Sequence, residues 1–354
     1  MPTLLLPPSP PGFLPPADLL VDQVTRRDLL RGAGLLTVAG VLAACGGSGS
    51  GETTPAAGDG GTRGYTDDAG RDVDIPVRPQ RIVATHGRNA GGLVLALGGP
   101  VVGIATRDGG LELAITRYFN AAGIETVGEY SEPDVKKIAT LRPDLIVHQA
   151  ADGQVSLEPE VVQRLEQLAP VVGFDVFQPV ETVTAKVVEL LGTPEAEQAA
   201  AEQRARYEEA LGELRAVLGD RWADVTASSL FFYGADAGYV AAGGPQINAG
   251  NNILTSLGVS WTPLVQQAAA NGQFLGDISV ERLPEFDADL LMVSTFEDPD
   301  VEALPLYGGL AAVRAGQVVA VPDNLVGTHY LNYTAVAEYL RDQLVGRELR
   351  TDLV

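Results

Sequence analysis

The chain contains very little sulfur and very little histidine. Cys45 is its only cysteine, and a single thiol excludes an intramolecular disulfide and any metal site built from several thiolates. No two histidines stand at a metal-ligand spacing such as i, i+4, which argues against a zinc or manganese site on the protein itself. Nucleophile elbows, phosphate loops and histidine-rich metal motifs are also missing from the sequence. We therefore expect neither catalysis nor a bound metal or cofactor.

Positive charge is scarce as well. Lysine and arginine together number 24 against 46 aspartates and glutamates, which gives a formal net charge of −22. A surface this acidic repels polyanions, so nucleic acid is excluded as a partner. With 45% hydrophobic and 20% charged residues, the composition is that of a soluble globular protein, and 354 residues are enough for two compact lobes.

The N-terminal region has the pattern of an export signal. Arg26 and Arg27 precede Leu29-Leu30 after one intervening residue, and an apolar run rich in Gly, Ala, Leu and Val then extends through Ala44. This run is too short to span a bilayer stably. The arginine pair resembles the twin-arginine signal that exports folded proteins. We expect translation to begin shortly before this pair, after about the first 20 proline-rich residues.

The apolar run ends in Leu42-Ala43-Ala44-Cys45, which resembles a lipobox, where the cysteine is acylated after cleavage. We predict a signal peptide at 1–44 and a lipid on Cys45. Residues 45–64 are rich in Gly, Ser, Thr and Ala and are predicted to form a flexible tether. The mature protein should then be anchored on the outer face of the cytoplasmic membrane.

From residue 65 onward, short apolar segments alternate with amphipathic ones, which predicts an α/β fold. Two sheet-and-helix lobes are expected at 65–178 and 219–354. Helical periodicity at 179–218, with Thr193-Pro194 as cap and first turn, predicts a rigid connector between them. The predicted strands are Arg81–Thr85, Val101–Ala105, Glu125–Val127, Leu145–His148, Val171–Phe174, Ser229–Tyr233, Tyr239–Ala242, Asp289–Ser294 and Val318–Val321.

Several segments of this body, taken in order, resemble one family. They include Pro79-Gln80-Arg81-Ile82-Val83, Leu95-Ala96-Leu97-Gly98, Leu141-Arg142-Pro143-Asp144-Leu145-Ile146-Val147 and Ala312-Val313-Arg314-Ala315-Gly316-Gln317-Val318. Their order and spacing resemble the helical-backbone solute-binding proteins of ABC importers, which bind ferric siderophores, haem and cobalamin. The resemblance implies two lobes bridged by a backbone helix, with the ligand held in a cleft between the lobes.

The loops that follow the predicted strands are the candidate ligand contacts, because open α/β sheets bind ligands at the carboxyl ends of their strands. Aromatic rings can cover apolar faces of a ligand while arginine and amide groups reach its oxygens, and Arg107 is the expected anion contact. The candidate ligand-binding residues are His86, Arg88, Arg107, Tyr130, His148, Gln149, Tyr233, Tyr239, Gln246, Phe274, His329 and Tyr330. The same loops also contain Asn89, Asp108, Glu129, Asp152, Asp236, Asn248, Gln273, Thr295, Glu297 and Asn324.

The resemblance also implies a docking surface for a permease. Relatives that feed an importer present an acidic residue on each lobe, which pairs with permease arginines. Glu281 occupies the matching place in the second lobe, whereas Lys136 occupies it in the first. A reversed rim charge should slow association with the usual partner. Glu132, one helical turn earlier, is the alternative acid.

These features together predict a monomeric, lipid-anchored component of an ABC importer that captures a ferric siderophore and delivers it to the permease. Two alternatives stay open: Tyr330 beside His329 could ligate haem iron, and Lys136 is compatible with an envelope protein that binds an iron chelate or haem without feeding an importer. The acidic surface favours hydroxamate chelates, which carry less negative charge than catecholates, although local arginines could reverse that preference.

Overall fold

The computed structural model describes residues 61–107, 113–130, 132–151, 154–233, 239–296, 300–304, 306–321 and 327–354. The predicted lipidation site Cys45 and export residues Arg26 and Arg27 lie outside the described residues. So do Asp108, Asp152, Asp236, Glu297 and Asn324. Within the described part of the chain, no helix combines the length and the apolar character needed to cross a bilayer.

The first lobe begins with an antiparallel hairpin of β1 (Thr62–Thr66) and β2 (Asp72–Pro76). β1 starts inside the segment predicted to be a tether, because Tyr65 lies opposite Val73 and both Tyr65 and Ile75 are buried in the lobe's core. Each strand of the hairpin thus has one side chain buried in the first lobe, Tyr65 on β1 and Ile75 on β2.

The main sheet of the first lobe has the strand order β5-β4-β3-β6-β7, with β8 pairing on β6. All its pairs are parallel except the short β6–β7 pair. Its strands are β3 (Ile82–Ala84), β4 (Val101–Thr106), β5 (Glu125–Glu129), β6 (Leu145–Ala151), β7 (Gln154–Val155) and β8 (Val171–Asp175). Its helices are α2 (Gly92–Ala96), α3 (Leu113–Thr116), α4 (Val135–Leu141) and α5 (Pro159–Glu166), preceded by a π-helical turn at Gly87–Gly91. Buried Val- and Ile-rich strands are typical of a parallel sheet covered on both faces.

The second lobe contains a mixed sheet with the order β12-β10-β9-β13-β14, and β11 pairs with β9. Its strands are β9 (Thr226–Tyr233), β10 (Tyr239–Gly243), β11 (Ser260–Trp261), β12 (Phe274–Ser279), β13 (Leu290–Phe296) and β14 (Val318–Val321). Its helices are α8 (Ala249–Leu257), α9 (Pro263–Ala270), α10 (Ala311–Ala315) and α11 (Tyr330–Leu344), with 3₁₀ turns at Gly219–Asp224, Val280–Phe286, Val301–Ala303 and Tyr307–Gly309.

Strand β12 was absent from the sequence prediction for a physical reason. Gly276 and Asp277 lie in its middle, and both residue types are depleted in strands. The pairing of β12 with β10 shifts by one residue at this point, and Asp277 has a φ of 55°. The segment is thus an edge strand with a bulge, which periodicity alone does not reveal.

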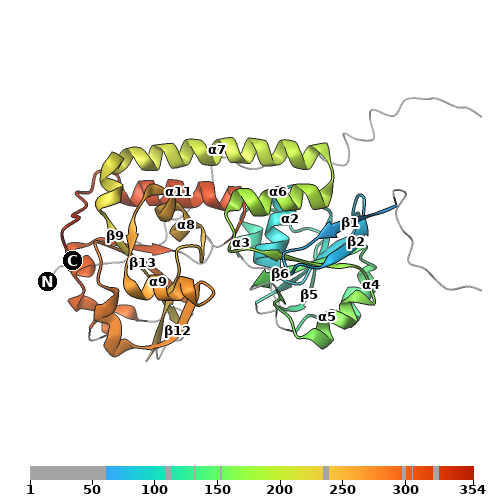
Figure 1. Ribbon diagram of the computed structural model, residues 1–354, viewed down its shortest axis with the longest axis horizontal. Coiled ribbons are helices and arrows are strands. Elements are labelled where there is room, and N and C mark those ends of the chain that lie inside the picture. Colours follow the sequence, from blue (N-terminus) through green and yellow to red (C-terminus); the bar gives the residue numbers. More distant parts are fainter. Residues whose placement is uncertain are drawn as a thin grey trace, which may run out of the picture. The chain divides into compact units, whose positions relative to one another are not determined.

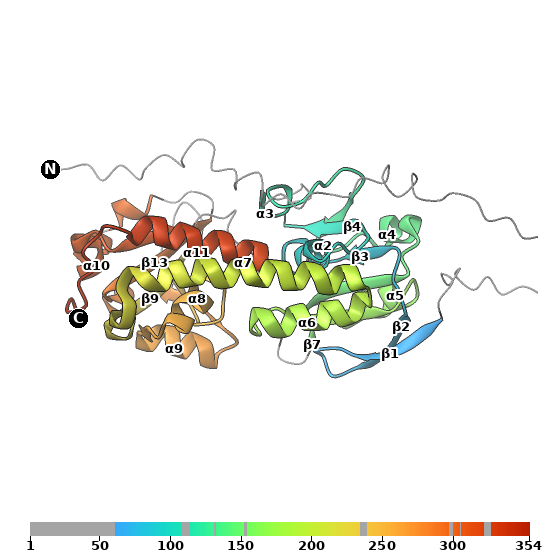
Figure 2. The ribbon, with the colours of Figure 1, turned by 90° about the horizontal axis from the view of Figure 1, so that it is seen from above.

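Two helices connect the lobes. α6 (Val180–Leu191) packs mainly in the first lobe's core, and α7 (Pro194–Leu218) continues from it after Gly192, whose φ is 61°. The Thr193 hydroxyl caps α7 by accepting a hydrogen bond from the Ala196 amide at 3.2 Å. α7 lies beside α6 and α11 (Figures 1 and 2).

The 25 residues of α7 give it a length of about 37 Å. Ala196 at its start belongs to the core of the first lobe, whereas Tyr207, Ala210 and Leu214 belong to the core of the second. The expected α/β fold with two lobes and a helical connector is confirmed. Both connector helices reach both cores, because Val180 of α6 also belongs to the core of the second lobe.

Candidate functional site

A cavity of about 230 Å³ is lined by residues of both lobes. Most of its lining residues follow the carboxyl ends of strands or precede helices, where the sheets of α/β proteins present their loops. The first lobe contributes His86, Arg88, Asn89, Arg107, Gln149, Val176 and Phe177. The second lobe contributes Phe231, Ile247, Asn248, Phe274, Ser294, Thr295, Val321, Gly327 and Thr328.

The first-lobe wall combines two arginines, two amides and the His86 ring with the apolar side chains of Val176 and Phe177. Arg88 lies in the π-helical turn after β3, and Arg107 directly follows β4. Asn89 donates a hydrogen bond from its Nδ2 to Gln149 Oε1 at 2.8 Å, which fixes the orientation of both amides. No aspartate or glutamate is found among the described residues that line the cavity. This wall can therefore bind anionic or carbonyl oxygens.

His86 is an uncharged polar group in the same wall. Its ring stacks on Tyr130 with centroids 4.0 Å apart and planes 10° apart, and its buried Nδ1 has no hydrogen-bond partner among the residues that the structure describes. Burial lowers the pKa of His86 to about 3, and the positive charge of Arg88 acts in the same direction. A neutral imidazole beside a cavity offers a ligand either a hydrogen-bond donor or an acceptor.

The second-lobe wall is mixed, with apolar side chains such as those of Phe231 and Phe274 beside an amide and three hydroxyl groups. The rings of Phe231 and Phe274 meet edge to face with centroids 6.3 Å apart. Phe274 follows Gln273, which has a φ of 70° and whose Oε1 accepts a hydrogen bond from the Gln246 amide at 2.9 Å. The Gln273 carbonyl also accepts from the Gly244 amide at 2.9 Å. A non-glycine residue adopts the left-handed conformation only where its surroundings stabilise it. The turn that leads into Phe274 therefore has a defined shape.

Several of the predicted ligand residues do not line the cavity. His148 is buried behind the wall, with Nδ1 2.7 Å from Thr85 Oγ1 and Nε2 3.1 Å from the Ser156 carbonyl. Burial lowers its pKa to about 4. Tyr130 lies behind His86 as its stacking partner. Tyr239 is 62% exposed outside the cavity, and Gln246 is exposed as well.

The candidates at the start of α11 are also placed in the interior. His329 caps α11 by accepting a hydrogen bond from the Asn332 amide, and its ring packs edge-on against Tyr118. Tyr330 is buried in the second lobe's core against Tyr207, with ring centroids 5.7 Å apart. Neither ring lines the cavity, so this geometry gives no support to haem ligation by Tyr330. The main chain of Tyr233 ends β9, and its side chain lies outside the described residues.

The predicted docking residues are on the surface. Lys136 is exposed in α4, and Glu132 is exposed just before that helix. Glu281 is exposed in the 3₁₀ turn that follows β12. Neighbouring Lys137 pairs with Glu125 at 3.6 Å.

Sequence reasoning missed about half of the lining residues. The signal for Phe177 was available, because it follows the predicted strand Val171–Phe174. Phe231 and Ser294 lie inside strands, where the period-2 pattern of a buried strand does not tell which residue faces a cavity. Three further lining residues precede helices, namely Ile247, Gly327 and Thr328. Two others are valines at strand ends, Val176 and Val321. No local sequence pattern indicates that residues at such positions line a cavity.

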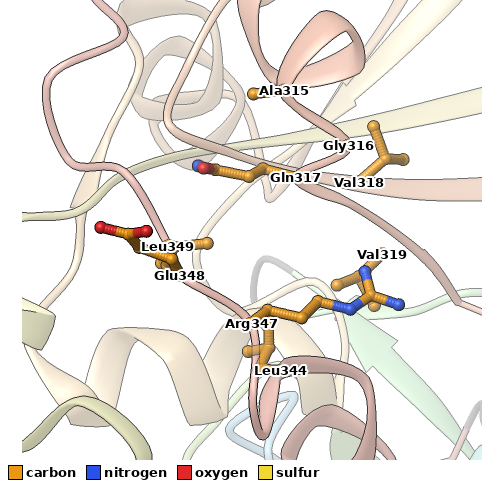
Figure 3. A pocket seen from close by; sticks show the side chains of 9 residues that line it. All are labelled: Ala315, Gly316, Gln317, Val318, Val319, Leu344, Arg347, Glu348 and Leu349. Carbon is orange, nitrogen blue, oxygen red and sulfur yellow. The ribbon is translucent and has the colours of Figure 1, made fainter.

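A second cavity, of about 340 Å³, lies within the second lobe alone (Figure 3). The C-terminal segment Leu344–Leu349 and the stretch Ala315–Val319 line it. The Arg347 guanidinium and the Glu348 carboxylate extend to opposite sides (Figure 3). The Gln317 side chain in this cavity makes hydrogen bonds to the main chain. Its Nε2 donates to the Arg350 carbonyl at 2.9 Å, and its Oε1 accepts from the Arg350 amide at 2.8 Å. The described residues that line this cavity all belong to the second lobe.

The chain matches the family model described as periplasmic binding protein over residues 82–325. This span is more than two thirds of the sequence, and the chain belongs to that family. Proteins of this kind are the binding components of ABC importers and work outside the cytoplasm. No curated protein sequence matches the chain.

Solved structures share the fold. The FhuD protein from S. pseudintermedius has a TM-score of 0.64 at 19% identity, covering 81% of this chain and 99% of its own. DesE, a ferric-siderophore receptor protein from Streptomyces coelicolor, has a TM-score of 0.64 at 22% identity, with coverage of 81% and 99%. Staphylococcus aureus SirA complexed with staphyloferrin B has a TM-score of 0.61 at 23% identity, with coverage of 80% and 98%.

Proposed function

We propose that this chain is the extracytoplasmic substrate-binding component of an ABC importer, and that it captures a ferric-siderophore complex and delivers it to the permease. The observation that carries the proposal is the cavity lined by both lobes, which brings arginine, amide and hydroxyl groups together with aromatic and aliphatic side chains. Such walls suit a metal chelate, which presents both oxygens and organic rings or chains. The fold shared with DesE and with SirA in complex with staphyloferrin B supports the same ligand class.

The proposal includes no catalysis and no resident cofactor. Iron enters as part of the ligand, and no cluster of metal-ligating side chains is found in the described part of the chain. The protein is proposed to act as a monomer anchored to the membrane through Cys45 after export by the twin-arginine route, as the N-terminal motifs suggest.

Isothermal titration calorimetry on the mature chain tests this function. Trp222 and Trp261 are buried in the second lobe's core and line neither wall, so calorimetry is a more direct probe than tryptophan quenching. We expect at least one ferric chelate among hydroxamate, catecholate and carboxylate types to bind with micromolar affinity or better, which corresponds to about −8 kcal/mol or stronger. If none of these chelates binds, the proposed function is wrong.

A second function is favoured by one observation, the exposed Lys136 on α4. The chain would then bind an iron chelate or haem in the envelope without feeding an importer. Ligand-stimulated ATPase activity of reconstituted importers separates the two functions. Tight chelate binding without stimulation of any candidate permease would favour the second function.

A further inference from the structure

The residues that join β1 to β2 pack along one edge of β8. Among the described strands, β8 pairs with β6. The Asp68 amide donates a hydrogen bond to the Gly173 carbonyl at 3.1 Å, and Asp67 Oδ2 accepts one from the Gly173 amide at 3.1 Å. The Arg71 guanidinium donates to the Val171 carbonyl at 2.8 Å. The hairpin thus satisfies main-chain groups of β8 that a further strand would otherwise bind.

The Asp68 side chain continues this contact beyond the end of β8. Its Oδ2 accepts a hydrogen bond from the Asp175 amide at 2.9 Å, and its Oδ1 accepts one from Gln178 Nε2 at 3.0 Å. The same Oδ1 forms an ion pair with Lys186 of α6, and the Asp68 side chain is 4% exposed. A carboxylate so far removed from water depends on its donors. Asp68 therefore joins the hairpin to both ends of residues 175–178 and to the connector.

Residues 175–178, here called the cavity turn, lead from β8 to the proline that precedes α6. Val176 and Phe177 of this turn both line the cavity between the lobes. The Phe177 amide donates to Asp175 Oδ1 at 3.0 Å, and the Phe177 side chain packs against the first lobe's core. Two lining residues thus lie on a short turn whose first and last residues are both bonded to Asp68.

We propose that Asp68 is a positioning residue for the ligand site. It is not one of the described residues that line the cavity, and it acts by holding the cavity turn so that Val176 and Phe177 are ordered before the ligand arrives. A ligand that has to order this turn itself binds more weakly, because the ordering entropy is then lost on binding. The inference rests on the proposed function, since it assigns a role toward the ligand of that site.

Asp68→Asn tests the positioning role with little change in shape. An amide nitrogen replaces one carboxylate oxygen, and in either orientation of the amide this nitrogen faces donors, the Asp175 amide or the side chains of Gln178 and Lys186. Ferric tris-hydroxamate, tris-catecholate and citrate complexes are titrated by calorimetry into the mature chain, below the melting temperature of every variant. For the complex that the wild type binds most tightly, we expect about 3- to 10-fold weaker binding to Asp68→Asn.

Arg71→Gln is the matched control for general destabilisation of the hairpin. Arg71 pairs with Asp67 at 2.7 Å and bonds the carbonyl of Val171, which begins β8 at the end away from the cavity turn. Both variants should lower the melting temperature, whereas Arg71→Gln should change the affinity for the same ferric complex by less than about twofold. Should Asp68→Asn fail to fold, Gln178→Ala removes one of the bonds to Asp68 and should weaken binding by a smaller factor in the same direction.

Two further measurements report on the cavity turn itself. Hydrogen exchange at the Asp175 and Phe177 amides should be at least about threefold faster in Asp68→Asn than in the wild type, and unchanged in Arg71→Gln. Phe177→Ala removes the larger of the two positioned side chains. In that background Asp68→Asn should weaken binding less than it does in the wild type, because residues that act through one another are not additive.

The outcomes separate the inference from the function on which it rests. Unchanged affinity of Asp68→Asn, an equal loss of affinity in Arg71→Gln, or full additivity with Phe177→Ala would overturn the positioning role and leave the ferric-chelate function standing. Absence of binding of every ferric complex to the wild type would remove both.

Discussion

His148 and His329 are buried and neutral in the folded chain. Their exposed fractions are 1% and 2%, and desolvation lowers their pKa values to about 4 and about 3. In the unfolded chain each regains an ordinary pKa near 6.5. Unfolding below pH 6.5 therefore takes up protons, so the stabilising effect of the neutral rings is complete above that pH and is lost as the pH falls toward 4.

We predict that the free energy of unfolding decreases from pH 7 to pH 5 by up to about 1.4 kcal/mol per pH unit for each of these histidines. Urea unfolding at pH 7, 6 and 5 measures the slope. His148→Gln keeps groups that can bond Thr85 and Ser156 but does not titrate, so its slope should be smaller. Identical slopes in the variant and the wild type would show that His148 is not the titrating group.

At the scale of elements, α7 contains a residue that weakens it. Gly212 lies in its exposed face, and a Cβ added there would meet no atom within 4 Å. Gly212→Ala should stabilise the chain by about 0.5–1 kcal/mol, because alanine loses less backbone entropy in a helix. Gly128→Ala is the contrasting variant, since Gly128 has a φ of 99° and its Cβ would come within 2.7 Å of the Asp134 amide nitrogen. Urea midpoints should move in opposite directions for these two variants.

Helix α4 and the turn after β12 carry the predicted docking charges. If Lys136 opposes a permease arginine and Glu281 attracts another, Lys136→Glu should raise ligand-stimulated ATPase activity of a reconstituted importer and Glu281→Lys should lower it. Both effects should shrink with added salt, because exposed charges are screened over about 10 Å at 0.1 M ionic strength. A loss of stimulation in Lys136→Glu would instead indicate an acidic partner on the permease.

The strands of both lobes were largely predictable, whereas the orientation of single side chains was not. His148 and Gln149 are neighbours in β6 and both were candidates, but successive residues of a strand point to opposite faces. Gln149 lines the cavity, and His148 bonds Thr85 in the core. The neighbours Thr328 and His329 also differ: Thr328 lines the cavity, whereas the His329 side chain caps α11. A position in such a loop predicts that a residue lies near the ligand. Only the packing of the completed fold decides which of two neighbouring side chains lines the cavity.

For the whole molecule, the proposed location rests on the N-terminal motifs. Cys45→Ser should move the protein from the membrane fraction to the soluble fraction, because it removes the thiol that we propose accepts the lipid. Replacing Arg26 and Arg27 with lysine should leave unexported precursor. Immunoblots of fractionated cells measure both effects. Membrane retention of the serine variant would rule out the lipid anchor, and normal export of the double lysine variant would point to the general secretory route.

The connector α7 also has a consequence for the cooperativity of the chain. Its first turns complete one hydrophobic core, and its Tyr207, Ala210 and Leu214 complete the other. If one lobe unfolded alone, the part of α7 that packs on it would lose its apolar contacts and would fray. The remaining lobe would then lose packing contacts as well. The free energies of the two lobes are therefore not independent, and the lobes gain stability jointly although each has its own sheet. The long connector thus ties the two halves into one thermodynamic unit, together with α6, whose Val180 also belongs to the second core, and with the hydrogen bond from the Tyr118 hydroxyl to Asn332 Oδ1 at 3.2 Å.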